Sequence, residues 1–165
     1  MSLGVAIKGP EGLVLAAESR LTVTGQIGSP EITVQASYDH ATKIFSFAAP
    51  HNYVGVVTYG LGTLQNRSAF SFIPEFENSL PDDRLPVKEF ADKMACFYET
   101  QWERIMPDDF DGPGMTFLVG GFDENQAYGE SISLRSLISP SRTSAIQTKA
   151  VRPNLGSLGA VNGNS

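Results

Sequence analysis

The chain begins with two short apolar runs on either side of a glycine-rich turn sequence. Val5 and Ile7 precede the sequence GPEG at 9–12, and Leu13 and Leu15 follow it. Apolar residues that alternate around such a turn are typical of a β-hairpin. The chain is therefore expected to start as antiparallel β structure.

The next segments continue in the same manner. A polar stretch to about residue 40, which contains Thr and Gly, predicts a strand and an exposed loop. Residues 43–47 alternate in polarity, residues 50–52 read as a turn, and residues 53–59 form a β-rich run. Two successive hairpins indicate a largely antiparallel sheet.

The middle of the chain changes to helical spacing. Apolar residues across 61–80 predict a helix that Pro74 should kink or split. A second helix is expected to begin at Pro86, to carry an apolar stripe over 87–105, and to stop at Pro107. An apolar run at 115–122 and residues 127–128 predict two further strands, and the pattern weakens from about residue 136.

Strands, then two helices, then strands again predict a single α+β domain over residues 1–165. A formal net charge of −6 argues against nucleic acid or an anionic membrane as a partner. The chain has no apolar run near the ~20 residues that span a bilayer and no signal-peptide pattern. A single cysteine, Cys96, suits a reducing compartment, so we expect a cytoplasmic protein.

No pattern in the sequence predicts a metal or a cofactor. The acidic stretch DDFDG at 108–112 lacks the spaced ligands of a calcium loop and reads as a solvated loop. The sequence GLG at 60–62 lacks the third glycine of a dinucleotide fingerprint. His40 and His51 share no spacing that implies metal binding or general-base catalysis.

Four polar or small residues lie at the edges of predicted strands: Ser2, Glu18, Lys43 and Gly60. A hydroxyl at a chain terminus can lose its proton to its own α-amine, whose pKa is ordinarily about 7.7–8.0. A lysine held by an acid favours the alkoxide, and a glycine N–H can hold the oxyanion of an acyl intermediate. A Glu–Lys pair that only stabilises the fold is the alternative interpretation.

Five segments, in order through residues 4–130, resemble the 20S proteasome subunits. They are VAIKGPEGLVLAAESRLT, ATKIF, VGVVTYGLGTLQNR, PVKEFADKMACFY and MTFLVGGFDENQAY. The resemblance implies the N-terminal-nucleophile hydrolase fold, a four-layer αββα sandwich of antiparallel sheets. The family's domain continues beyond the point where this sequence stops, so we expect either that the sequence is truncated at its C-terminus or that the second half of the sandwich is reduced.

The resemblance assigns roles to the residues that match the family's motifs. It implies that Ser2 is the nucleophile, that Glu18 and Lys43 are the catalytic acid and lysine, and that Gly60 forms the oxyanion site. Ser19 and Arg20 would support the site, and the loop before Lys43 is about ten residues longer than usual. Glu at 18 and Ser at 2 replace the family's Asp and Thr, and Met1 leaves Ser2 without a free amine. The chain as printed is therefore expected to be inactive by this mechanism.

The resemblance implies amide-bond hydrolysis of peptide or protein substrates within a homo-oligomeric ring or shell. The sequence leaves two other functions open. One is a non-catalytic subunit of a similar assembly, and the other is a small-molecule amidohydrolase or ligand-binding module on the same scaffold, because a fold does not fix a function.

Overall fold

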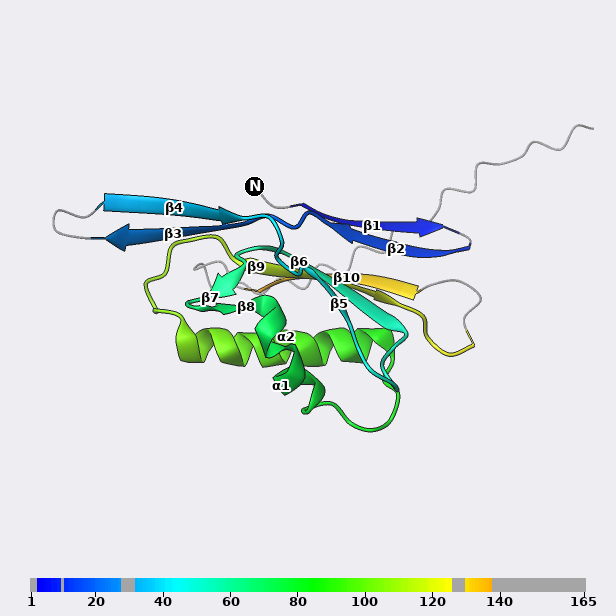
Figure 1. Ribbon diagram of the computed structural model, residues 1–165. Coiled ribbons are helices and arrows are strands. Elements are labelled where there is room, and N and C mark those ends of the chain that lie inside the picture. The colour runs from blue at the N-terminus through cyan, green and yellow to red at the C-terminus, as the bar shows by residue number, and fades with distance from the viewer. Residues whose placement is uncertain (1–2, 10, 28–31, 126–129, 138–165) are drawn as a thin grey trace, which may run out of the picture.

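The chain folds into three layers, which a computed structural model describes for residues 3–9, 11–27, 32–125 and 130–137. Two β-hairpins form the first layer, a four-stranded antiparallel sheet forms the second, and the helices form the third (Figure 1). Helices gathered on one side of antiparallel strands define an α+β protein. The predicted fold class is confirmed at this level.

The hairpin layer contains four strands, and the central sheet has the order β10-β9-β6-β5. The hairpin strands are β1 (Gly4–Gly9), β2 (Gly12–Ala17), β3 (Leu21–Ile27) and β4 (Ile32–Tyr38). The central strands are β5 (Ile44–Ser46), β6 (Val54–Gly60), β9 (Met115–Gly121) and β10 (Glu130–Leu137). The remaining elements are β7 (Thr63–Leu64), β8 (Arg67–Ser68), the 3-10 helix η1 (Ala69–Phe72), α1 (Ile73–Glu77) and α2 (Val87–Ile105).

The β1–β2 hairpin forms where the sequence predicts it, with Gly4 opposite Ala17 and Gly9 opposite Gly12. Its inner face rests on the central sheet, where Leu13 and Leu15 pack so closely over Gly120 and Gly55 that a Cβ on either glycine would meet a leucine methyl group. Small residues in the sheet therefore allow the first two layers to approach each other.

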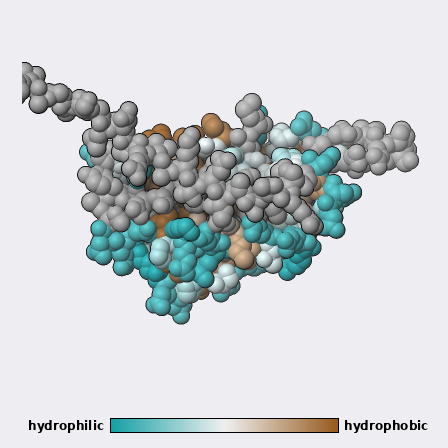
Figure 2. Space-filling model, turned by 180° about the vertical axis from the view of Figure 1, so that it is seen from behind, coloured by the Kyte–Doolittle hydropathy of each residue, from teal (hydrophilic) through white to brown (hydrophobic). Residues whose placement is uncertain are grey.

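The outer face of this hairpin is also apolar. Ile7 and Val14 are cross-strand partners, and they are 61% and 59% exposed. Figure 2 shows hydrophobic side chains along the top of the molecule, above a lower surface that is mostly hydrophilic. The hairpin thus has one apolar face on the sheet and a second that no described residue covers.

The two inner strands of the central sheet, β6 and β9, are buried on both faces. Val56 and Phe117 belong to the hydrophobic core that the sheet shares with the helices. Val57 and Leu118 are also buried, but they are not part of that core. Strands covered on both sides are expected to read as continuous apolar runs. This explains the uninterrupted apolar sequences at 54–57 and 117–119.

The predicted second helix is confirmed as α2. It begins after Pro86, ends at Ile105 and presents its apolar stripe to the sheet. Tyr98 anchors this face because its hydroxyl donates to the carbonyl of Ala69 at 2.8 Å. In the described part of the chain no helix is long and apolar enough to cross a membrane.

Two predictions of local structure are wrong. Residues 61–80 do not form one kinked helix: the small β7–β8 hairpin turns at Gln65, which has a φ of +50°, and only then come η1 and α1. Pro74 lies in the first turn of α1, where a missing N–H costs little, so it starts a helix instead of kinking one. Residues 21–38, expected as a strand and a loop, form the β3–β4 hairpin, and the predicted strand at 127–128 lies outside the described residues.

Candidate functional site

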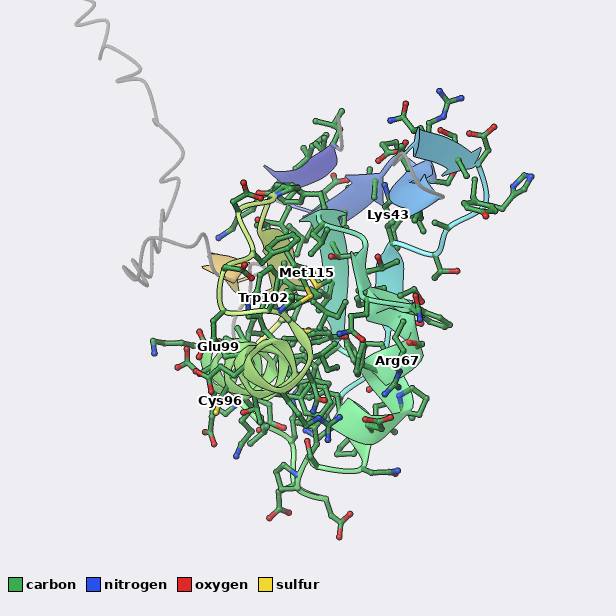
Figure 3. All side chains as sticks on the ribbon, turned by 90° about the vertical axis from the view of Figure 1, so that its left-hand side faces the viewer. Lys43, Arg67, Cys96, Glu99, Trp102 and Met115 are labelled. Carbon is green, nitrogen blue, oxygen red and sulfur yellow. The ribbon has the colours of Figure 1, made fainter. Side chains whose placement is uncertain are left out.

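A buried lysine stands at the junction of the hairpin layer and the central sheet (Figure 3). Lys43 immediately precedes β5, and its side chain is 6% exposed. Its Nζ donates to Glu18 Oε1 and to the carbonyl oxygen of Arg20. Burial of an ammonium group is costly unless the charge is paired and hydrogen-bonded, and these two acceptors meet that requirement.

Glu18 follows β2 and receives two hydrogen bonds. Its Oε1 accepts from Lys43, and its Oε2 accepts from the backbone N–H of Arg20 at 2.5 Å. Burial alone would raise the pKa of Glu18, but these two hydrogen bonds and the charge of Lys43 outweigh it and hold the pKa below its ordinary value. The site therefore contains a carboxylate and a cation facing each other.

Ser19 and Arg20 bind the segment between β4 and β5. Ser19 Oγ donates to the carbonyl of Asp39 at 2.6 Å, and Arg20 Nε donates to Asp39 Oδ1 at 2.7 Å. The backbone adds a third link, from the N–H of Ala41 to the carbonyl of Ser19 at 2.9 Å. These contacts join the two ends of the β3–β4 hairpin and so position Lys43 relative to Glu18.

Leu3, the first residue that the structure describes, also contacts Glu18. The N–H of Glu18 donates to the carbonyl of Leu3 at 3.3 Å, and this contact continues the β1–β2 register beyond the pair of Gly4 and Ala17. Ser2, the predicted nucleophile, lies outside the described residues. Its described neighbour Leu3 is nevertheless hydrogen-bonded to the catalytic-acid candidate.

Gly60, the predicted oxyanion residue, ends β6 opposite Met115. It has a φ of +87°, and a Cβ at this position would lie 2.4 Å from the carbonyl oxygen of Gly114. The fold therefore requires glycine here for its backbone conformation and for close approach. Gly60 is not among the residues that line the pocket beside Lys43.

A pocket of about 610 Å³ opens beside Lys43. Its walls are Leu21, residues 37–43, Thr58, Gly62 and residues 68–70. Thr58 is 3% exposed, and its N–H donates to the carbonyl of Lys43 at 2.9 Å. Among the described residues, Thr58 Oγ1 has no hydrogen-bond partner. The pocket thus combines apolar walls with a buried ammonium group and an unpaired hydroxyl.

Two residues of this site were missed by the sequence analysis. Thr58 lies in a β-rich run that reads simply as a buried strand, and nothing in the sequence predicts that its hydroxyl is unpaired. Asp39 lies in a stretch expected as a loop, and no local pattern joins it to Arg20, which lies 19 residues earlier in the sequence. Across the described ranges, no three His, Cys, Asp or Glu side chains come together as metal ligands.

Comparisons of the chain with protein-family models, with curated proteins and with solved structures find no match.

Proposed function

We propose that this protein is a proteasome-like N-terminal-nucleophile peptidase. One observation carries the proposal: Glu18 forms an ion pair with the buried Lys43, and the backbone N–H of the same Glu18 donates to Leu3, the residue before β1. An N-terminal nucleophile requires the first residues of the chain beside a cation. An ion pair that only stabilised the fold would not need Leu3 beside it.

The proposed reaction uses Ser2 after Met1 has been removed. Ser2 Oγ attacks the carbonyl carbon of the scissile amide while its proton passes to the α-amine of Ser2. The C–N bond then breaks, the leaving amine takes that proton, and an ester links the acyl group to Ser2. Water hydrolyses the ester, which releases the carboxylic acid and restores the hydroxyl. Lys43 stabilises the developing negative charge, and the Gly60 N–H is the proposed oxyanion donor.

Glu18 positions Lys43 in this proposal. Its carboxylate and the Arg20 carbonyl hold the ammonium group in one place. The Glu18 carboxylate is ionised at neutral pH, and its lowered pKa extends to more acidic conditions the range in which the lysine retains its counterion. A fixed cation stabilises a transition-state charge more effectively than a mobile one, because no reorganisation is needed during reaction.

The pocket beside Lys43 is the proposed binding site for a substrate side chain. Leu21 and Phe70 contribute apolar surface, and the unpaired Thr58 hydroxyl is buried at the wall of the pocket. Buried polar groups favour ligands that pair with them. We therefore expect a preference for peptides with a hydrogen-bonding side chain of moderate size next to the scissile bond.

The four-layer αββα sandwich is part of the same proposal. Three layers are described, and the fourth layer of an αββα sandwich would lie on the outer face of β1–β2, where Ile7 and Val14 are exposed. Burial of such a face is favourable by about 25 cal/mol for each Å² of apolar surface. A homo-oligomeric ring or shell in the cytoplasm is the assembly that accompanies this proposal.

The test begins with a chain whose first residue is Ser2, prepared by proteolytic removal of a leader. We expect a peptide β-lactone or peptide boronate to add one equivalent of inhibitor, measured by intact mass. The matched controls are the chain that retains Met1 and a chain that begins with Ser2→Ala, and neither should gain mass. Lys43→Ala in the Ser2 chain should lose the adduct while it keeps the circular-dichroism spectrum. A Ser2 chain that takes up no inhibitor would refute the peptidase proposal.

A non-catalytic subunit is the second candidate. The observation that favours it is that Lys43, Glu18 and Gly60 all have structural explanations in the ion pair and in the strained backbone. Failure of the Ser2 chain to react, together with a multimeric particle in solution, would support this candidate.

A further inference from the structure

The β3–β4 hairpin projects from the body of the protein (Figure 1). Its strands pair over seven positions, from Leu21 opposite Tyr38 to Ile27 opposite Ile32, and neither strand pairs with a third among the described residues. Seven residues at about 3.4 Å each give an arm roughly 24 Å long. An isolated two-stranded hairpin is only marginally stable in water, so an arm of this length gains from a partner.

The base of the arm is fixed to the body. Arg20 and Asp39 form an ion pair across it, and Leu21 packs where a Cβ on Gly62 would stand. Beyond this base the strands make their extensive contacts only with each other. The arm is therefore anchored at its base, and among the described residues the backbone N–H and C=O groups along its two outer edges have no strand partner.

The arm lacks the residues that usually prevent a free strand edge from pairing with another chain. Neither strand contains a charged residue or a proline, and β-branched residues occupy about half of the positions. Val23 is 38% exposed and Tyr38 is 58% exposed. Natural edge strands generally carry Lys or Pro, or are covered, because an unprotected edge pairs with other chains.

We infer that this arm joins two copies of the chain by pairing edge to edge with the same arm of a second copy. The two hairpins would then form one continuous antiparallel sheet across a twofold axis, in which each copy uses the same surface. Backbone hydrogen bonds supply the attraction, and the exposed Val23 would gain cross-strand contacts in the new sheet.

The uncharged arm is the part of this acidic chain that a second copy can approach with the least repulsion. The whole chain carries a net charge of −6, so two copies repel each other at most approaches. The arm brings no charge to the contact, and a strongly basic or acidic partner would find nothing there to pair with. A peptide substrate is disfavoured as the partner of the arm. Only the first two cross-strand pairs, Leu21 with Tyr38 and Thr22 with Ser37, contain residues that line the pocket, and the rest of the arm extends away from it.

The test measures particle mass by light scattering after size-exclusion chromatography over a hundredfold range of concentration. We expect the unmodified chain to exceed the monomer mass of 17.8 kDa. The double variant Val23→Glu and Gln35→Glu places a negative charge on each strand of the arm, so like charges approach each other whichever edges pair, and its mass should fall. The matched control, Lys93→Gln with Thr100→Glu on α2, makes the chain equally more negative and should keep the mass of the unmodified chain.

A second measurement applies if the double variant folds poorly. In a Cys96→Ser background, Val23→Cys or Gln35→Cys should form an intermolecular disulfide on mild oxidation, whereas Thr100→Cys should not. A monomeric unmodified chain at all concentrations, or no arm cross-link, would overturn the inference. Lys43→Ala should leave the particle mass unchanged, so this test is independent of the peptidase proposal. If the unmodified chain is monomeric and a variant of the arm no longer binds peptide, the arm binds substrate instead.

Discussion

Lys43 is more deeply buried than the residue that neutralises it: its side chain is 6% exposed, whereas that of Glu18 is 31% exposed. The two ends of this ion pair therefore differ in their access to water. If Lys43 is removed, Glu18 can be solvated from its exposed side. If Glu18 is neutralised, the ammonium group stays buried with only the Arg20 carbonyl and a neutral neighbour.

Glu18→Gln should therefore destabilise the protein more than Lys43→Met does. The glutamine keeps an acceptor but loses the charge, and we expect a loss of about 2 kcal/mol, below the range of fully buried pairs because Glu18 is partly solvated. Lys43→Met keeps the length of the side chain and should cost about 1 kcal/mol. Urea unfolding at pH 7 measures both, and the reverse order would show that the carboxylate bears the larger desolvation cost.

Stability should also depend on pH through Glu18. Its pKa in the folded protein lies below the ordinary value of 4.5, so the folded state favours the ionised form. This contribution is complete above pH 4.5 and disappears as the pH falls through the folded pKa. The difference in unfolding free energy between the unmodified chain and Glu18→Gln should be constant from pH 7 to about 5 and shrink at lower pH. A difference that does not change with pH would contradict the paired carboxylate.

Gly60→Ala should destabilise the fold whether or not Gly60 takes part in catalysis. The new Cβ would meet the Gly114 carbonyl at 2.4 Å, and the φ of +87° is unfavourable for alanine. We expect a loss of about 1–3 kcal/mol in thermal or urea unfolding. Gly12→Ala is the matched control, because no heavy atom lies within 4 Å of its Cβ position. Equal effects of the two substitutions would argue against a strained backbone at Gly60.

The spacing of apolar residues predicted those helices and strands in which the apolar residues of the pattern are also the buried ones. The β1–β2 hairpin, α2 and β9 all show a one-sided or continuous apolar pattern, and each forms within a few residues of its expected bounds. The segment 61–80 failed because its apolar residues enter the core in either conformation. Leu64 and Phe72 are buried, but one lies in a strand and the other in a 3-10 helix.

The candidate site was only partly predictable. Glu18 and Lys43 are 25 residues apart, and no local pattern joins them; the resemblance to proteasome subunits suggested the pair, and the structure brings the two side chains together. The pocket has no counterpart in the sequence, since it depends on how η1 packs beside the start of β5. The unpaired hydroxyl of Thr58 follows from that packing as well.

Thr58→Val should stabilise the protein and alter its selectivity. A buried hydroxyl without a partner costs about 1–3 kcal/mol, and valine has nearly the same shape, so the free energy of unfolding should rise by about 1 kcal/mol. Thr116→Val on β9 is the control, and this partly exposed position should show little change.

If the pocket binds the substrate side chain, Thr58→Val should cleave a peptide with Gln next to the scissile bond about tenfold less efficiently than the parent, measured as kcat/KM. Cleavage of the matched Leu peptide should be unchanged. An equal loss for both peptides would place the substrate side chain elsewhere, while a drop in stability would mean that the hydroxyl has a partner in solution.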